Sequence, residues 1–351
     1  MKYLQLLTLF LLLPLTLMAE NYRMGWRGLL LDSGRQYQTV DYIESLLDSM
    51  AVRSMNVFHW HLTENDGWRM QLPNYPRLTE VGAFVASGKE QQGYYSVAEM
   101  RHIVAYAAER GITVVPEIDL PGHSGALIAA YPEFGCSKEV VCPANADILD
   151  FLKGVIDNVC DIFPAEYVHL GGDEVNQSVW HNCTDCQQLM QREGLSSEAA
   201  LQVWFERQLI DYLATKGRKA ILWEDVLYET SDPLPDNVVI QWWNYRSKGE
   251  MGLREALRRG LPVICSSNYY CYLNFPEEPW GGYAQDRTCT ATDIEERNPS
   301  HLLYESANPL MLGMEACLWT DYNLTQSMLQ QRLFPRLDIL ARQMRGTITK
   351  Q

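Results

Sequence analysis

The chain has 351 residues, of which 47% are apolar, and this is enough to bury the core of one large or two ordinary globular domains. The formal net charge of −15 and the lack of any basic cluster argue against nucleic acid as a partner.

The amino terminus has the layout of a secretory signal. Residues 1–19 contain Lys2, a leucine-rich run interrupted by Pro14, and a possible cleavage site after Ala19. The run is too short to span a membrane comfortably, although an uncleaved anchor is the alternative. We therefore expect a secreted or periplasmic protein whose mature chain is residues 20–351.

Nine cysteines are present, and an odd number leaves at least one of them unpaired. Cys183 and Cys186 form a single C-x-x-C. A zinc site would need two more ligands, and only His181 lies close to this motif in the sequence. The sequence therefore favours a disulfide or plain structural role for this pair and predicts no metal site.

Short apolar segments alternate with amphipathic helical stretches from Gly28 onward, and no linker divides them. Eight segments are predicted strands: 28–31, 56–62, 113–118, 167–170, 220–223, 238–242, 262–266 and 312–316. The intervening predicted helices include 40–49, 97–110, 148–160, 198–215 and 250–259. This order predicts an α/β fold, a single-domain (β/α)₈ TIM barrel.

Polar residues follow each predicted strand, where a TIM barrel has its active site. They include Asp32 and Arg35 after the first strand, Gly171–Glu174 after the fourth, and Trp319–Asp321 after the eighth. A doubly wound sheet would instead concentrate its ligands at one switch point. The distribution therefore favours the barrel.

Several motifs at these strand ends resemble the catalytic domain of glycoside hydrolase family 20, the β-N-acetylhexosaminidases. They are R-G-L-L-L-D-S-G-R from Arg27, H-W-H-L-T-E-N-D-G-W-R from His59, E-I-D-L-P-G-H from Glu117, H-L-G-G-D-E from His169, W-E-D from Trp223, Q-W-W from Gln241, Y-L-N from Tyr272 and W-T-D from Trp319. The resemblance covers roughly residues 25–341 and implies a barrel-only member of the family.

The resemblance implies that Glu174 protonates the leaving oxygen and then activates water. Asp173 would accept the N–H of the substrate's 2-acetamido group, whose carbonyl oxygen is the nucleophile in this family. We expect partial burial to raise the pKa of Glu174 and Asp173 to stay ionised. A solvated acidic turn is the alternative reading of this pair.

Aromatic residues at the strand ends are candidates for the sugar pocket. By resemblance, Tyr272 donates its hydroxyl to the acetamide carbonyl, with Tyr269 and Tyr270 as competitors. Trp223, Trp319 and one of the pair Trp242–Trp243 would stack on sugar rings, and a core position is the alternative for each. Strand alternation allows only one of the pair to face inward, and we favour Trp243.

Three polar residues match positions that hold the terminal sugar in the family. Arg27 corresponds to the arginine that binds hydroxyls 3 and 4. Asp321 stands where a glutamate is usual for hydroxyls 4 and 6, and this shorter side chain departs from the family pattern. Asn274 lies near hydroxyl 6, where a neutral amide would tolerate a sulfated sugar.

A supporting network is expected behind the acids. His123 and His169 would orient Glu174 and tune its proton affinity, together with Glu117 and Asp119, while Asp225 would buttress the pocket. A structural role is the alternative for His169. His59 and His61 are two residues apart and could be mistaken for metal ligands.

The leading functional hypothesis is an exo-β-N-acetylhexosaminidase that releases terminal β-linked GlcNAc or GalNAc from glycans without a cofactor or metal. The alternatives are a related enzyme acting on a longer or modified substrate, including a disaccharide-releasing enzyme, a β-1,6-GlcNAc polymer hydrolase or a 6-sulfo-GlcNAc hydrolase, and a non-hydrolytic glycan-binding protein. The sequence leaves the oligomeric state and the disulfide pairing open.

Overall fold

The structure is a computed structural model that describes residues 24–86, 92–281, 283, 287–297 and 308–346. The expected signal, residues 1–19, lies outside this range. No helix in the described part of the chain is both long and apolar enough to cross a membrane.

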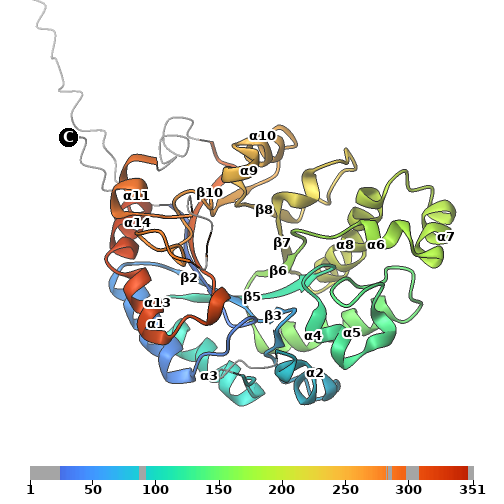
Figure 1. Ribbon diagram of the computed structural model, residues 1–351, viewed down its shortest axis with the longest axis horizontal. Coiled ribbons are helices and arrows are strands. Elements are labelled where there is room, and N and C mark those ends of the chain that lie inside the picture. Colours follow the sequence, from blue (N-terminus) through green and yellow to red (C-terminus); the bar gives the residue numbers. More distant parts are fainter. Residues whose placement is uncertain (1–23, 87–91, 282, 284–286, 298–307, 347–351) are drawn as a thin grey trace, which may run out of the picture.

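Eight parallel strands close into a barrel at the centre of the molecule (Figure 1), in the order β1-β10-β9-β8-β7-β6-β5-β2. Their bounds are β1 Trp26–Asp32, β2 Val57–His61, β5 Thr113–Leu120, β6 Tyr167–Gly171, β7 Lys219–Trp223, β8 Val238–Trp242, β9 Val263–Cys265 and β10 Met311–Leu318. A short antiparallel pair, β3 Thr63–Glu64 and β4 Gly67–Trp68, follows β2.

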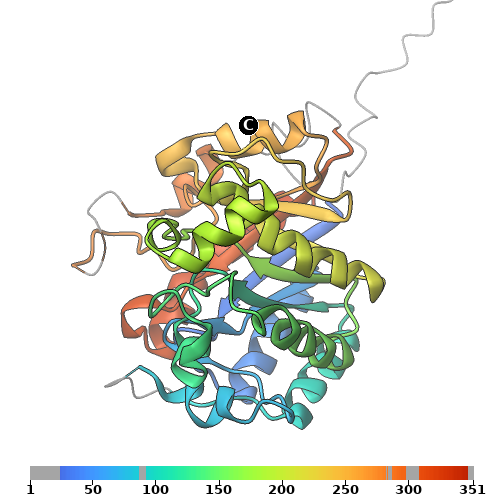
Figure 2. The ribbon, with the colours of Figure 1, turned by 90° about the vertical axis from the view of Figure 1, so that its right-hand side faces the viewer.

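The helices surround the strands, as the perpendicular view of Figure 2 also shows. They are α1 Val40–Val52, α2 Arg77–Glu80, α3 Val97–Ala108, α4 Gly125–Ala130, α5 Ile148–Ile162, α6 Ser178–His181, α7 Thr184–Glu193, α8 Glu198–Thr215, α9 Tyr245–Lys248, α10 Met251–Arg258, α11 Ala291–Arg297, α13 Gln326–Leu333 and α14 Arg336–Met344. Each long helix turns an apolar face to the strands; α5, for example, buries Leu152, Ile156 and Val159.

Local sequence explains where several helices begin. Thr39 accepts a hydrogen bond from Tyr42 N at the start of α1, and Ser96 forms a capping box with Glu99 at the start of α3. The predicted barrel and all eight predicted strands are confirmed, with ends that differ by a few residues. The short helices α4, α6 and α7 in the loops after β5 and β6 were not predicted.

The barrel interior changes character along its axis. Side chains including Trp26, Val57, Ile221 and Val239 form an apolar plug at the amino ends of the strands. The next inward positions along the strands carry buried polar groups, among them His59 on β2. Because inward positions alternate along a strand, the third set opens at the carboxyl ends, where a TIM barrel has its active site.

Candidate active site

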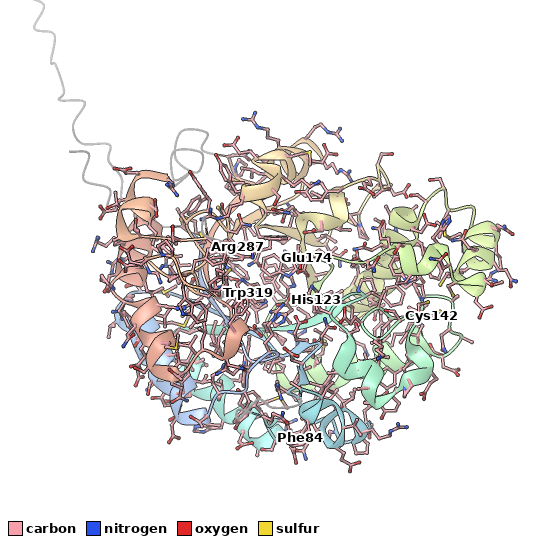
Figure 3. All side chains as sticks on the ribbon, in the orientation of Figure 1. Phe84, His123, Cys142, Glu174, Arg287 and Trp319 are labelled. Carbon is pink, nitrogen blue, oxygen red and sulfur yellow. The ribbon has the colours of Figure 1, made fainter. Side chains whose placement is uncertain are left out.

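A pocket of about 460 Å³ lies at the carboxyl ends of the strands. Its lining residues are Arg35, Asp173, Glu174, Trp223, Trp243, Asn244, Arg246, Ser247, Asn268, Tyr272, Asn274, Phe275, Arg287, Trp319 and Asp321. Figure 3 labels Glu174, Trp319, Arg287 and His123, which gather near the middle of the ring of helices. A volume of this size is typical of a small-ligand site.

A second hollow, of about 520 Å³, lies at the amino ends of the strands. Its lining is mainly apolar, with Val57, Val104 and Leu312 among its residues. Since parallel barrels perform their chemistry at the carboxyl ends, and the predicted acid pair lines the other pocket, we assign the site to the carboxyl-end pocket.

Asp173 and Glu174 follow β6 after Gly171 and Gly172. The backbone of Glu174 has a positive φ of 50°, a conformation that costs about 1–2 kcal/mol for a residue with a side chain. This turn gives the two acids different surroundings: the side chain of Asp173 is 16% exposed, whereas that of Glu174 is 58% exposed. Oδ1 of Asp173 is buried and has no hydrogen-bond partner among the described residues.

These surroundings differ from two expectations. The partial burial predicted for Glu174 is wrong, because Glu174 is the open member of the pair. Burial instead acts on Asp173, raising its pKa to about 7, and the negative charges of Asp225 and Glu174 act in the same direction against the attraction of His123. The protein groups around Asp173 therefore do not by themselves keep it fully ionised at neutral pH, contrary to the prediction.

His123 lies against both acids. Its Nε2 is 3.7 Å from a carboxylate oxygen of Asp173 and 3.7 Å from one of Glu174. Its Nδ1 is 2.8 Å from Glu64 Oε1. Burial alone would lower the pKa of His123, but Glu64, Asp173 and Asp119 raise it well above its ordinary value. A protonated His123 at this place offsets part of the negative charge of the acid pair.

His169 and Glu117 lie deeper in the barrel. Nδ1 of His169 is 3.0 Å from Glu117 Oε1, which also accepts a hydrogen bond from Trp223 Nε1 at 2.9 Å. Burial would raise the pKa of Glu117, but the neighbouring His169, His61 and His59 hold it well below its ordinary value. Among the described residues, His169 contacts neither Asp173 nor Glu174, so it reaches the acids only through this network.

Asp119 links the deep network to the acid turn. Its Oδ1 accepts a hydrogen bond from Gly172 N at 3.4 Å, and burial together with the charge of Asp173 raises its pKa well above the ordinary value. The structure thus places Asp119 beneath the turn that carries Asp173 and Glu174, as a supporting residue would be.

Asp225 connects the acid turn to an aromatic wall. Its Oδ2 accepts a hydrogen bond from Trp243 Nε1 at 2.7 Å, and its Oδ1 lies 3.5 Å from Glu174 N. The Trp243 ring stacks on Tyr272 with an angle of 14° between the planes. Trp242 points the other way and is buried against Tyr245, so strand alternation brings Trp243 to the pocket, as favoured from the sequence.

The three candidate tyrosines occupy different places. Tyr272 lines the pocket and contacts the Trp319 ring. Tyr270 is buried with its hydroxyl 3.1 Å from Cys265 Sγ, and Tyr269 packs against Tyr245. Only Tyr272 among them can meet a bound sugar in this pocket.

Asn274 and Asp321 meet through Tyr283 at the far side of the pocket. The Tyr283 hydroxyl donates to Asp321 Oδ1 at 2.6 Å and accepts from Asn274 Nδ2 at 3.1 Å. Burial raises the pKa of Asp321, and its hydrogen bond with Tyr283 and the charge of Arg35 oppose this. The carboxyl group of Asp321 is thereby held in a fixed orientation.

Arg27 is not in the pocket, and its predicted role in binding sugar hydroxyls there is wrong. It is the second residue of β1, at the opposite end of the barrel, and it alternates with the inward-facing Trp26. Its guanidinium donates to the backbone oxygens of Ser54 and Met24. Of the two arginines in this motif, the one that lines the pocket is Arg35, at the other end of the motif.

Arg35 packs its guanidinium against two buried carboxylates. It lies 3.0 Å from Asp32 and 3.0 Å from Glu64, and its guanidinium is 5.2 Å from the centre of the Trp319 ring. The rule that strand carboxyl ends carry the site could have selected Arg35 over Arg27. Other lining residues were also missed because they lie on irregular loops or on the four-residue helix α9: Asn244, Arg246, Ser247, Asn268, Phe275 and Arg287.

A closed parallel barrel with an acid pair and an aromatic pocket at its carboxyl ends defines a catalytic barrel of the glycoside hydrolase class. Residues 24–344 match the model of glycosyl hydrolase family 20, catalytic domain. The chain belongs to this family.

Relatives and solved structures agree with this assignment. A β-hexosaminidase of Porphyromonas gingivalis is 34% identical, over 93% of this chain and 44% of its own. The structure of a β-N-acetylhexosaminidase from Bacteroides fragilis superposes with a TM-score of 0.88 at 50% identity, covering 92% of this chain and 66% of its own. A family 20 exo-β-N-acetylglucosaminidase from Vibrio harveyi, solved with N-acetylglucosamine, has a TM-score of 0.83 at 29% identity, over 92% of this chain and 54% of its own. The chain thus spans about half to two thirds of the length of these relatives.

Proposed function

We propose that this protein is an exo-β-N-acetylhexosaminidase that removes terminal, non-reducing β-linked GlcNAc or GalNAc from glycans. The observation that carries the proposal is the unequal acid pair. Oδ1 of Asp173 is buried and has no hydrogen-bond partner in the described part of the chain, while the neighbouring Glu174 is open to the pocket. A buried acceptor beside an accessible acid suits a substrate that brings its own amide N–H. The complex of the Vibrio harveyi relative with N-acetylglucosamine is consistent with such a ligand.

In the proposed reaction the acetamide carbonyl oxygen attacks the anomeric carbon while the bond to the leaving oxygen breaks. Glu174 gives its proton to that oxygen. The resulting oxazolinium ion is positively charged, and its N–H donates to the carboxylate of Asp173. Water then attacks the anomeric carbon from the side of the departed group, while the bond between that carbon and the acetamide oxygen breaks and the acetamide is restored. The attacking water loses a proton to Glu174. Two inversions give net retention of configuration.

The raised pKa of Asp173 fits this scheme once substrate is bound. The substrate's N–H would donate a hydrogen bond that the described protein groups do not give to Oδ1, and positive charge would develop beside the carboxylate. Both favour the ionised form. His123, 3.7 Å away, adds a positive charge on the same side.

Other lining residues would hold the terminal sugar. Tyr272 would donate its hydroxyl to the acetamide carbonyl and keep that oxygen in line for attack. Trp223, Trp243 and Trp319 would enclose the ring. Arg35 and Asp321 would bind its hydroxyls, since buried neighbours outside the lining, Asp32 and Tyr283, hold them in place.

The first test is an assay of the purified chain with p-nitrophenyl-β-GlcNAc and p-nitrophenyl-β-GalNAc. Glu174→Gln and Asp173→Asn should each reduce kcat by at least about 100-fold, in line with the loss of a general acid or of electrostatic stabilisation. Glu109→Gln changes an exposed acid at the end of α3 and serves as the control. Glycan binding without release would favour a binding protein, and release only from longer chitooligosaccharides or β-1,6-GlcNAc polymers would favour the related enzymes.

Participation of the acetamide has its own test. Successive fluorination of the acetyl methyl group makes the carbonyl oxygen a weaker nucleophile. The rate should fall with each fluorine, and the p-nitrophenyl β-glucoside, which lacks the acetamide, should not react. A rate that is independent of fluorination would rule out the substrate-assisted mechanism while leaving hydrolysis intact.

We also propose that the pocket tolerates a 6-sulfate. Asn274 is a neutral residue of the lining, and the cationic Arg246 and Arg287 line the same pocket. Turnover of 6-sulfated p-nitrophenyl-β-GlcNAc within about tenfold of the unsulfated substrate is expected. Turnover of the unsulfated substrate alone would refute this idea.

We propose that the protein is exported through residues 1–19. Amino-terminal sequencing of the protein recovered outside the cytoplasm should begin near residue 20. Retention of residues 1–19 on membrane-bound protein would indicate an uncleaved anchor instead.

A further inference from the structure

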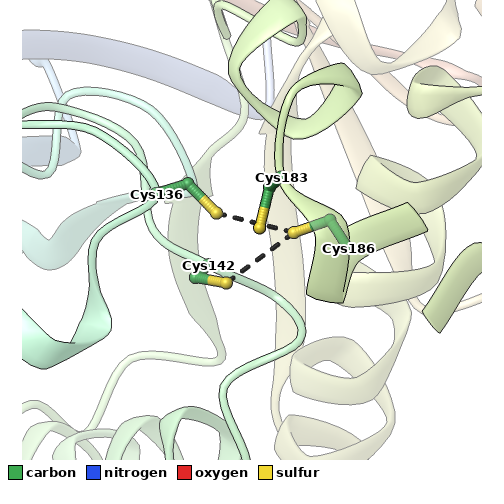
Figure 4. Close-up of side chains that lie close together, drawn as sticks. All are labelled: Cys136, Cys142, Cys183 and Cys186. Carbon is green, nitrogen blue, oxygen red and sulfur yellow. Dashed lines mark hydrogen bonds between the residues drawn. The ribbon is translucent and has the colours of Figure 1, made fainter. Parts of the chain in front are cut away.

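Four cysteines converge at the outer edge of the barrel, away from the pocket. Cys136 and Cys142 lie on the loop after β5, and Cys183 and Cys186 lie at the start of α7 (Figure 4). Their four Sγ atoms all lie within 4.8 Å of one another. The sequence offered only His181 as a neighbour of the C-x-x-C, but His181 is bound to Glu198, and the fold supplies two cysteines from about 40 residues away instead.

The spacing of the sulfur atoms fits a tetrahedron better than two disulfides. Sγ of Cys186 is 3.5 Å from that of Cys136 and 3.7 Å from that of Cys142. Four thiolates at the usual Zn–S distance of about 2.3 Å form a tetrahedron with edges of about 3.8 Å. A disulfide would bring two sulfurs to about 2.05 Å and would pair Cys186 with one neighbour only.

Backbone hydrogen bonds hold the two segments that carry the four thiols. The loop between Cys136 and Cys142 is closed by hydrogen bonds from Cys136 N to Val140 O at 2.9 Å and from Cys142 N to Phe134 O at 2.7 Å. Across from it, Cys183 caps α7 and Cys186 lies in its first turn. The two sides also meet directly, since Trp180 Nε1 donates to Val141 O at 3.0 Å.

The neighbouring core is small. Cys186 belongs to an apolar cluster with Val140, Trp180, Leu189 and others that is separate from the main core of the barrel. Outlying loops with so little buried apolar surface gain stability from a metal or covalent cross-link.

We propose that Cys136, Cys142, Cys183 and Cys186 bind one Zn²⁺ ion as four thiolates. Up to four thiol protons are released as the metal enters, and no redox change is involved. Four protein ligands leave no open position, so the site is structural. The zinc site would tie together the loop after β5, which carries His123, and the segment after β6, which carries Asp173 and Glu174.

Measurements of the metal content and of the oxidation state of the four cysteines test the proposal. The full chain, residues 1–351, is expressed with its own amino terminus, so that no added signal directs it to a compartment. It is then purified without reductant or chelator. We expect about one zinc per chain by elemental analysis. A thiol-specific mercurial should release this zinc, and intact-mass measurement should show no disulfide among the four cysteines. Two disulfides, four reduced thiols without metal, or iron in place of zinc would each overturn the proposal.

Variants locate the site. Cys136→Ser with Cys183→Ser should lower the zinc content to below about 0.1 per chain, whereas Cys160→Ser, which changes a partly buried cysteine of α5 outside the cluster, should leave it unchanged. If the double variant does not fold, Co²⁺ exchange into the native chain provides the second measurement. The intense visible bands of tetrahedral Co²⁺ with thiolate ligands are expected, and the weak bands of octahedral Co²⁺ with oxygen ligands would contradict the proposal.

Discussion

At the scale of single residues, Asp173 and Glu174 are neighbours in the chain, yet one is enclosed and the other is open. The difference arises from the backbone turn, in which Glu174 has a positive φ, and from the charged groups beneath it. Residue type and spacing could not reveal this, because the turn depends on which groups the barrel brings underneath.

The raised pKa of Asp173 predicts a specific pH dependence of stability. The folded state keeps this proton up to about pH 7, whereas the unfolded state loses it near pH 3.9, so stability falls as pH rises between these values. Asp173→Asn has no such proton to lose. Its free energy of unfolding, relative to that of the native chain, should therefore rise by up to about 4 kcal/mol between pH 4 and pH 8. Urea unfolding of both proteins measures it. The exposed Asp161→Asn is the control, and parallel curves for Asp173→Asn and the native chain would contradict the prediction.

Substitutions of the two arginines of the first motif should have different effects, on activity for Arg35 and on stability for Arg27. Arg35→Ala should lower kcat/KM by about 100-fold, because it removes a charged donor from the pocket. Arg27→Ala should leave kcat/KM within about threefold and lower the free energy of unfolding by about 1–3 kcal/mol, because its bonds are to backbone oxygens at the far end of the barrel. Steady-state kinetics and urea unfolding provide both values. A loss of activity in Arg27→Ala at unchanged stability would contradict this assignment.

At the scale of elements, most of the site residues that could be predicted lie at the carboxyl ends of strands. The alternation of β8 explains why Trp243 and not Trp242 reaches the pocket, and the carboxyl ends of β7 and β10 bring Trp223 and Trp319 to the same place. Strand position is readable from sequence, so these residues could be predicted. Arg246, on the short helix α9, and Asn268, on an irregular loop, could not be predicted, because their positions depend on contacts such as the hydrogen bond from Arg246 N to Asn268 Oδ1.

The turn after β6 should be unusually intolerant of a methyl group. Gly171 has φ +74°, and a Cβ there would lie 1.8 Å from Asp119 Oδ1; Gly217, at the end of α8, has φ +68° with open space around it. Both Ala variants carry about 1–2 kcal/mol of backbone strain, but only Gly171→Ala should add a further 1–3 kcal/mol from the clash. It should also lower kcat by at least about tenfold. Equal stability losses in the two variants would show that Asp119 moves aside freely.

At the scale of the whole molecule, the barrel could be predicted from eight recurring segments. Its repeating unit, a strand followed by a helix, is formed by residues that are close together in the sequence. The contacts among the buried charged residues inside the barrel could not be predicted in the same way, since the contacting residues come from strands far apart in the sequence. Glu315 on β10 accepts hydrogen bonds from Trp26 and Gln241 and lies 2.7 Å from His59 Nδ1. One carboxylate thus connects β1, β2 and β8 across the barrel.

These buried charges should make the fold sensitive to alkali. Burial would lower the pKa of His59, but Glu315 and Glu117 raise it to about 9. The stability that this charge contributes is present below about pH 6.5 and is lost as pH rises through 9. The native chain should lose up to about 3 kcal/mol over this window and Glu315→Gln distinctly less. Urea unfolding at pH 6 and 9.5 compares them, and an equal loss in both would contradict the assignment.

The closure of the barrel also brings the two ends of the described chain together. Met24 N donates to Met344 O at 3.1 Å, beside the amino ends of the strands. A short peptide could therefore join these ends, and the chain could be reopened at an exposed loop as a circular permutant with the same barrel. Any module fused at either end would leave the barrel from one common point, on the side opposite the pocket, so both fusions would leave the entrance clear.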